Sequence, residues 1–354
     1  MTETVYVGLS DTYPITIGDN AWSGIVSHLE KNPFTSSITV VDERVNALYG
    51  ERFFRLTDGI NKPAFRFILP EGEPSKSFAY LESLCRSMAR SGMDRESLVL
   101  ALGGGVVGDL AGLAASVYLR GVRLIQLPTT LLSMVDSSVG GKTGINIPEG
   151  KNLVGTFYQP EAVIADTSVL GTLDERDWYS GLVEVIKIAL TFDPNLFGYM
   201  ESVKDLGPFG DLDVTRTIAA ACRQKAKVVE LDEKEGGLRK ALNFGHTLGH
   251  GVEASLGYGV LRHGEAVLLG MRAALILSTR MCGLPPDQFQ RAIELLDRIP
   301  IPDVEFPPDL NRFIIKDKKS SGNRITGVFI KEIGKHEFVS LEDPSVLVEA
   351  LKGP

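Results

Sequence analysis

The stretch that decides the fold is ESLVLALGGGVVGDLAGLAASVYLRGVRLIQLP, residues 96–128. A short apolar run, typical of a buried strand, leads into three glycines, a segment with helical spacing and a second apolar run. Two strands joined through a helix predict a parallel pair covered by that helix. The same alternation extends outward, with strands expected at 36–43, 64–71, 96–104 and 122–128 and helices at 45–56, 77–92 and 106–121.

The pattern changes beyond about residue 170, where helical periodicity dominates and strand signals are few. The 354 residues also suit two domains better than one. We therefore expect an α/β domain with a mostly parallel sheet over residues 1–170. Residues 171–354 are expected to form a helical domain, in which a short strand-like pair at 325–343 precedes the last helix. Residues 5–18 are expected to open the chain as a hairpin.

Composition indicates a globular enzyme without membrane or nucleic-acid partners. Hydrophobic residues make up 44% of the chain and charged residues 23%. No apolar run reaches about 18 residues, so we expect no transmembrane helix, and the first residues lack a signal-peptide pattern. The net charge of −8 argues against nucleic acid or anionic membrane as the main partner. Three widely separated cysteines predict free thiols in the cytoplasm.

The glycine-rich segment GGGVVGD, residues 103–109, predicts a phosphate site. Glycines let the backbone approach a pyrophosphate, and the start of a helix presents unpaired N–H groups. The segment is not GxGxxG, and a glycine turn without a ligand is the alternative. Polar residues also follow the neighbouring expected strands at Asp42, Glu71 to Lys76 and Thr129–Thr130. An acidic residue at a strand end suits ribose hydroxyls, although a turn-forming aspartate gives the same pattern.

Two further segments are expected to be glycine-flexed loops that carry lysines. VDSSVGGKTGIN contains Asp136 and Lys142, and GKNLVGTFYQP contains Lys151 and Asn152. We interpret both lysines as contacts for an anionic ligand, with a solvated surface position as the alternative for each.

Three of the five histidines fall within residues 239–265, RKALNFGHTLGHGVEASLGYGVLRHGE. His246 and His250 are four apart, which places both imidazoles on one face of a helix. This spacing suits zinc, and a catalytic zinc needs one more protein ligand. His263 or a carboxylate elsewhere could supply it. The alternative is two hydrogen-bonded structural histidines and a surface His263.

The segment GLVEVIKIAL supplies a candidate for the missing carboxylate. Glu184 and Lys187 lie three apart on one face of an otherwise apolar helix. They are either a structural ion pair or a metal ligand beside a substrate-binding lysine. Lys225, Arg239 and Lys240 lead to the histidines and add positive charge, and Asn243 adds a neutral donor and acceptor.

Six segments together resemble the 3-dehydroquinate synthase family of sugar-phosphate cyclases. They are GGGVVGDLAG, RGVRLIQLPTTLLSMVDSSVGGKTGIN, GKNLVGTFYQP, GLVEVIK, DEKEGGLRKALNFGHTLGH and RHGEAV. The likeness covers most of the chain in order and is most specific over residues 100–270. It implies the shikimate-pathway conversion of 3-deoxy-D-arabino-heptulosonate 7-phosphate to 3-dehydroquinate and phosphate. The implied steps are transient oxidation at C5 by NAD, phosphate elimination, re-reduction, ring opening and intramolecular aldol closure. It further implies tightly bound NAD, one zinc or cobalt ion, and a homodimer. Residues 1–170 would then be a Rossmann-like, NAD-binding α/β domain, and residues 171–354 an all-α metal- and substrate-binding domain.

Carried over by position, the resemblance implies Glu184, His246 and His263 as metal ligands, with His250 on the substrate side instead of in a HxxxH ligand pair. Arg120 is implied to reach across the dimer. The implied NAD contacts are Asp42, Glu71, Gly72, Glu73, Lys76, Gly105, Val106, Val107, Gly108, Asp109, Thr129, Thr130, Lys142, Lys151 and a strand end formed by Val169, Leu170, Gly171 and Thr172. The implied substrate contacts are Asp136, Lys142, Asn152, Lys187, Lys225, Arg239, Asn243, His250 and Lys318, with Lys319 as the alternative to Lys318.

Three other functions remain in competition. A related cyclase would make a valiolone, a scyllo-inosose or an amino-dehydroquinate. Arg239, Asn243 and the lysine after Asp317 favour a substrate that carries a carboxylate. A metal-dependent polyol or glycerol-phosphate dehydrogenase would stop at oxidation, which Lys151, Asn152 and Arg239 disfavour. A non-catalytic NAD-binding protein would not need the glutamate and two histidines.

Overall fold

The computed structural model describes residues 2–257, 259–317 and 325–351, and the chain forms two compact units. The first unit comprises residues 1–173 and 213–230, and the second comprises 174–212 and 231–354. The expected boundary at residue 170 is close to the end of the first segment, but helix α8 (Val214–Leu231) joins the first unit and not the helical one. Helical periodicity alone does not say which body a helix packs on. The Cys222 thiol of α8 donates to the Met134 carbonyl at 3.3 Å, within the first unit.

A seven-stranded sheet organises the first unit. All its neighbouring strands are parallel except β1 (Thr2–Val7) and β2 (Tyr13–Gly18), which form the expected opening hairpin. The central strand β5 (Leu98–Gly103) is buried on both faces at all six positions, whereas in the edge strand β4 (Ala64–Leu69) exposed residues alternate with more buried ones. In spatial order the strands are β1 (Thr2–Val7), β2 (Tyr13–Gly18), β9 (Ala162–Asp166), β6 (Arg123–Pro128), β5 (Leu98–Gly103), β3 (Ser37–Asp42) and β4 (Ala64–Leu69).

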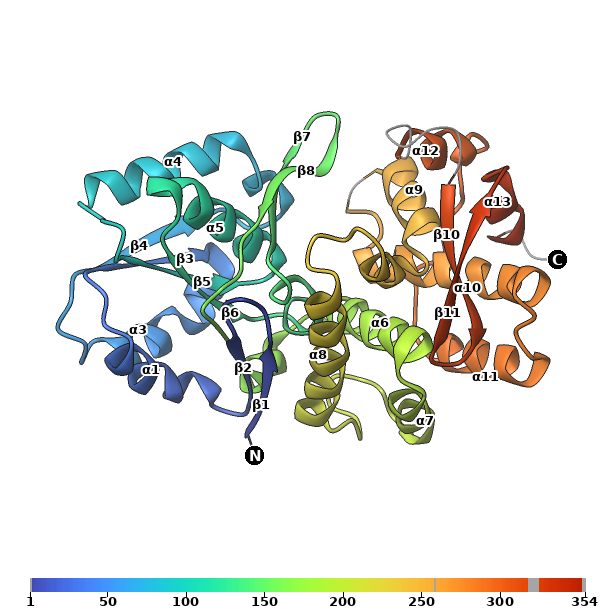
Figure 1. The fold of residues 1–354 in the computed structure, drawn as a ribbon, viewed down its shortest axis with the longest axis horizontal. Helices are drawn as coiled ribbons and strands as arrows, with labels where there is room; N and C mark the ends of the chain where they lie inside the picture. Colours follow the sequence, from blue (N-terminus) through green and yellow to red (C-terminus); the bar gives the residue numbers. More distant parts are fainter. Residues whose placement is uncertain (1, 258, 318–324, 352–354) are drawn as a thin grey trace. The chain divides into compact units, whose positions relative to one another are not determined.

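Helices cover both faces of this sheet (Figure 1). Helices α4 (Phe78–Arg90) and α5 (Gly105–Val117) lie on one face, and α1 (Ile25–Lys31) and α3 (Glu51–Thr57) lie on the other. Between β3 and α3 the chain continues through α2 (Glu43–Val45) and the π-helical turn Asn46–Gly50. Helix α5 is rich in apolar residues because it is packed against β5, β6 and α4, and seven of its residues are buried.

Two elements of this unit differ from expectation. Residues 142–157, expected as glycine-flexed loops, form an antiparallel hairpin of β7 (Lys142–Ile147) and β8 (Gly150–Phe157). Glycine permits this pairing, because a Cβ on Gly155 would lie 2.0 Å from the Thr143 carbonyl oxygen. Residues 169–172, expected as a strand end, belong to the 3₁₀ helix Thr167–Thr172 that follows β9. The strand β9 itself was not predicted.

The second unit is mainly helical, with α10 (His263–Met281) at its centre. Against α10 pack α6 (Glu175–Phe192), α9 (His246–Leu256), α11 (Pro286–Asp297), α13 (Ser345–Leu351) and the hairpin β10 (Ile325–Glu332) with β11 (Lys335–Leu341). The helices α7 (Pro194–Ser202) and α12 (Leu310–Asp317) were not predicted. None of the helices in the described ranges has the length and apolar character of a membrane span.

Glycines bring the helices of this unit into backbone contact. A Cβ on Gly270 of α10 would lie 1.9 Å from the Gly245 carbonyl oxygen, directly before α9. A Cβ on Gly264 would lie 2.3 Å from the Ser180 carbonyl oxygen of α6. Side chains at these positions would separate α10 from both neighbours. Gly264 and Gly270 therefore allow the close helix contacts that position His246 and His263 at the starts of α9 and α10.

We predict that Gly270→Ala lowers the free energy of unfolding by about 2–3 kcal/mol, because the added methyl group cannot be accommodated without moving α9. Gly198→Ala is the matched control, since Gly198 also lies within a helix but has no atom within 4 Å of the added Cβ. We expect that control to be neutral or stabilising by up to about 1 kcal/mol. Chemical denaturation measures both, and equal effects would contradict the close contact.

Candidate active site

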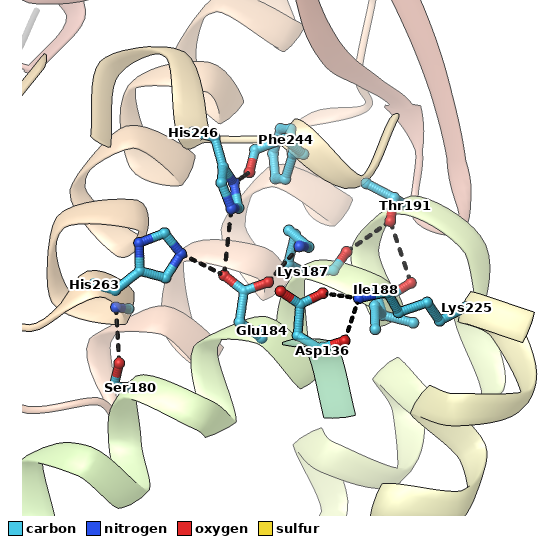
Figure 2. A network of polar contacts seen from close by, with 11 residues as sticks. Asp136, Ser180, Glu184, Lys187, Ile188, Thr191, Lys225, Phe244, His246 and His263 are labelled. Atoms are coloured by element: carbon cyan, nitrogen blue, oxygen red, sulfur yellow. Dashed lines mark hydrogen bonds and ion pairs between the residues drawn. The ribbon is translucent and has the colours of Figure 1, made fainter. Parts of the chain in front are cut away.

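Three helices of the second unit bring one carboxylate and two imidazoles together. Glu184 lies inside α6 and is fully buried, whereas His246 and His263 are the first residues of α9 and α10. The Glu184 Oε1 atom is 3.7 Å from His246 Nε2 and 3.6 Å from His263 Nε2 (Figure 2). One donor atom from each of the three residues lies within 4.8 Å of the others.

The other nitrogen of each ring has its own oxygen partner. His246 Nδ1 is 3.2 Å from the Phe244 carbonyl oxygen, and His263 Nδ1 is 3.7 Å from Glu253 Oε2. A carbonyl oxygen only accepts, so Nδ1 of His246 carries the proton and Nε2 keeps its lone pair. Both rings thus direct Nε2 toward Glu184, as metal-binding histidines do.

Lys187 binds the second carboxylate oxygen of Glu184. The two side chains, one helical turn apart on α6, form a buried ion pair through Glu184 Oε2. The ion pair that we considered as a structural alternative therefore exists. It also leaves Oε1 directed at the histidines (Figure 2), so the pair orients the carboxylate and does not exclude a ligand role.

Burial and charge push the two histidines in opposite directions. Burial, with the nearby positive charge of Lys187, lowers the pKa of His246 well below its usual value. Burial alone would also lower the pKa of His263, but the Glu184 and Glu253 carboxylates outweigh it and raise this pKa to about 9. In the metal-free protein His246 is therefore neutral and His263 is protonated at neutral pH.

The donor set fits a divalent transition metal. One carboxylate oxygen and two imidazole nitrogens are the ligand types of a catalytic zinc site, which keeps another position open for substrate. The two histidines of the HxxxH pattern do not both belong to this donor set. The His250 side chain is exposed, with its ring centroid 5.3 Å from that of His246, and it lies outside the set of converging donor atoms.

Residues near the start of α9 hold two other predicted side chains. Arg239 is 1% exposed, and its Nη1 donates to the Glu233 carbonyl at 2.5 Å. The Asn243 amide donates to Glu235 Oε1 at 2.8 Å. Neither Glu235 nor Glu253 was predicted as part of the site. Glu253 could have been found from its spacing, because it lies seven residues after His246 on the same face of α9.

In the first unit, the predicted nucleotide contacts follow the carboxyl ends of parallel strands. Asp42 ends β3, Glu71 to Lys76 follow β4, Thr129 and Thr130 follow β6, and α5 begins at Gly105 directly after β5. The order of strands reverses between β3 and β5, since the chain runs from β3 to β4 on one side and from β5 to β6 on the other. Open α/β sheets bind nucleotides at such a point. Close packing also explains part of the glycine motif, because a Cβ on Gly105 would lie 3.2 Å from Ser137 Oγ.

Lys76 joins two of the predicted contacts. Its ammonium group is buried, donates to Asp109 Oδ2 at 2.6 Å, and also donates to the Asn152 side chain. Burial raises the pKa of Asp109, and the charge of Lys76 opposes that rise. Asn152 has a φ of 56°, a left-handed conformation that asparagine tolerates better than most residues. A residue predicted to contact NAD therefore holds a residue predicted to contact substrate.

The structure places the remaining predictions as follows. Lys225, 5% exposed on α8, forms an ion pair with Asp136 and donates to its carbonyl at 2.5 Å (Figure 2). The Tyr49 hydroxyl donates to the Val169 carbonyl at 2.9 Å. Lys142 is exposed and Lys151 half-buried in the β7–β8 hairpin. Arg120 is exposed with a φ of 66°. Lys318 and Lys319 lie outside the described residues.

Two family models match consecutive parts of the chain. The model "3-dehydroquinate synthase N-terminal" matches residues 66–180, and "3-dehydroquinate synthase C-terminal" matches residues 181–320. The 3-dehydroquinate synthase of Acidithiobacillus ferrooxidans is 42% identical over 352 residues, covering 96% of this chain and 95% of its own length. That of Geobacter metallireducens is 42% identical over 359 residues, covering 98% of each chain.

Solved structures with the same fold carry cofactors. A 2-epi-5-epi-valiolone synthase from Streptomyces hygroscopicus, solved with NAD⁺ and Zn²⁺, is 26% identical with a TM-score of 0.86 over 96% of each chain. A 2-deoxy-scyllo-inosose synthase, solved with carbaglucose-6-phosphate, NAD⁺ and Co²⁺, has a TM-score of 0.91 over the full length of both chains. Its 24% identity supports the fold alone. A probable glycerol dehydrogenase from Sinorhizobium meliloti, at 15% identity and a TM-score of 0.61, is similar only in fold.

The protonation of His263 predicts a pH-dependent metal affinity. A divalent metal must displace the proton that His263 carries below about pH 9, so apparent zinc affinity should rise about tenfold per pH unit from pH 7 and level off above pH 9. Calorimetric titration at pH 7, in buffers with different ionisation enthalpies, should show about one proton released per metal. An affinity that stays constant between pH 7 and 8.5 would contradict this protonation state.

Proposed function

This chain belongs to the 3-dehydroquinate synthase family, and we propose that it binds one divalent metal, zinc or cobalt, through Glu184, His246 and His263. Its reaction is that of a carbon–oxygen lyase acting on phosphates, which forms 3-dehydroquinate and phosphate from 3-deoxy-D-arabino-heptulosonate 7-phosphate. The observation that carries the proposal is the buried, converging carboxylate and imidazole set, in a chain 42% identical to named synthases over nearly its full length.

The chain's residues hold the ligand atoms of a metal that would act beside NAD. When bound, the metal supplies a Lewis acid for the C5 hydroxyl, and NAD supplies an acceptor that takes a hydride and later returns it. The chain's part is to hold the ligand atoms in place. Lys187 fixes Glu184 Oε2, and the Phe244 carbonyl fixes the His246 ring. Each prevents a buried ligand from turning away.

We propose that NAD binds at the carboxyl edge of the first unit's sheet. The support is the reversal of strand order between β3 and β5 and the helix that starts at Gly105, whose first N–H groups suit a pyrophosphate. The proposed contacts are Asp42, Glu71 to Lys76, Gly105 to Asp109, Thr129, Thr130, Lys142, Lys151 and Val169 to Thr172.

The substrate carries a phosphate and a carboxylate, so it needs fixed positive charge. In the second unit, the proposed contacts are Lys187, Arg239, Asn243 and His250, with Lys318 from outside the described residues. In the first unit they are Asp136, Lys142, Asn152 and Lys225. Buried cations bind anionic oxygens strongly because water does not screen them. We propose that an oxygen of the departing phosphate takes the C6 proton, so that these residues hold the phosphate and no side chain is required as base.

We further propose that the protein is a cytoplasmic homodimer. Arg120, exposed and left-handed at the end of the 3₁₀ turn Tyr118–Arg120, would then contact the partner's substrate, as the family resemblance implies. Three free cysteines agree with a reducing compartment. Neither nucleic acid nor membrane is needed for this activity.

A phosphate-release assay tests the function. We expect release from the seven-carbon acid phosphate that needs both metal and NAD, without net accumulation of NADH, because each hydride taken is returned. Activity should fall at least about 100-fold on metal removal and recover with zinc or cobalt.

The alternatives predict other outcomes in the same assay. Preferential release from sedoheptulose 7-phosphate or glucose 6-phosphate would show a cyclase for neutral sugar phosphates. Steady formation of NADH from an alcohol would show a dehydrogenase.

The ligand assignment predicts that His263→Ala loses bound zinc while NAD affinity is kept. Elemental analysis and fluorescence titration with NADH measure the two properties. His28→Ala is the control, because His28 pairs with Glu161 at 3.2 Å in the first unit and should retain zinc. Unchanged zinc content in His263→Ala would refute the assignment.

A further inference from the structure

A second carboxylate lies beside the proposed metal site without a role in the reaction described above. Glu253 is 5% exposed and projects from the same face of α9 as His246, seven residues earlier. Its Oε2 atom lies 3.7 Å from His263 Nδ1. Burying a carboxylate is costly unless a positive or proton-donating partner compensates it. The position of Glu253 therefore requires an explanation.

The His263 ring lies between two carboxylates. Glu184 is at Nε2, 3.6 Å away, and Glu253 is at Nδ1. A carboxylate at Nδ1 favours the tautomer that carries the hydrogen there, and leaves the Nε2 lone pair available on the side of Glu184. We infer that Glu253 is a positioning residue, which orients His263 and increases its basicity as a metal ligand. This inference rests on the proposed metal site.

The comparison with His246 supports this reading. The Nδ1 atom of His246 faces a neutral acceptor, the Phe244 carbonyl, at 3.2 Å. Both histidines are the first residues of their helices, where the helix dipole disfavours positive charge and makes an imidazole less basic. Only His263 has a carboxylate at Nδ1 to oppose that effect.

The balance of charge around the proposed metal site also supports a role for Glu253 in metal binding. The buried group already contains one positive charge on Lys187 and one negative charge on Glu184. A divalent cation would add two positive charges beside the buried side chains of Glu184 and Lys187. Glu253 supplies a second negative charge close to a ligand without occupying a position at the metal. Removing it should weaken metal binding even if the three ligands stay in place.

Glu265 provides a matched comparison. It is also buried and lies on α10, two residues after His263, but its carboxylate caps the helix and accepts from the Arg176 guanidinium at 2.7 Å. The carboxylate of Glu265 therefore serves the fold. If Glu253 were equally structural, the two substitutions to glutamine should behave alike.

We predict that Glu253→Gln lowers the affinity of the metal-free protein for zinc about 10–100-fold. Competition with a chromophoric chelator measures that affinity. The visible spectrum of the cobalt-loaded variant should also shift, since a weaker His263 donor changes the ligand field. The unfolding temperature of the metal-free variant should stay close to that of the wild type. Glu265→Gln should do the reverse, lowering the unfolding temperature and keeping zinc affinity within about threefold.

Two results would overturn the inference. One is zinc affinity and a cobalt spectrum unchanged in Glu253→Gln. The other is a loss of metal-free stability in Glu253→Gln as large as in Glu265→Gln, which would make Glu253 structural. Both leave the proposed function intact. Unchanged zinc content in His263→Ala would instead refute the metal site on which the inference rests.

Discussion

The second unit depends on the buried carboxylate of Glu184, whose two oxygens face different partners. Lys187 binds one oxygen from the same helix, and the imidazoles of His246 and His263 face the other. A charge without solvent must have such partners, so three helices are constrained to meet at this point. Glycines at the contacts of α10 make that meeting possible, because a side chain there would overlap backbone atoms of α6 or of the residue before α9.

The first unit meets a different constraint, since parallel strands end at one edge with their polar residues together. The reversal of order between β3 and β5 opens that edge for a ligand. Lys76 then ties the edge to the β7–β8 hairpin, because its ammonium bonds to Asp109 and Asn152 and its carbonyl accepts from the Asn146 N–H at 2.8 Å. Lys76 and Asp109, which we propose as NAD contacts, therefore share one hydrogen-bond network with Asn152, which we propose as a substrate contact.

Much of this could be predicted from the sequence. Short apolar runs indicated the strands β3 to β6, and the motifs that contain Glu184, His246 and His263 resembled those of a known family, which implied the three ligands. The β7–β8 hairpin was missed because its glycines resemble loop residues, although they are what allows the strands to approach. The unit to which α8 belongs depends on the contacts of Cys222 and Lys225, which periodicity does not encode. The spacing from His246 could have placed Glu253 on the ligand face of α9, but its contact with His263 depends on how α9 packs against the start of α10.

A mutation can remove the Nδ1 partner of one histidine but not that of the other. The partner of His246 at Nδ1 is the main-chain carbonyl of Phe244, which every amino acid would supply at that position. The partner of His263 is the side chain of Glu253, which a single nucleotide change can remove. Natural variation in metal preference or loading should therefore accumulate at the second histidine's neighbour, while the surroundings of the first stay fixed by the course of the backbone.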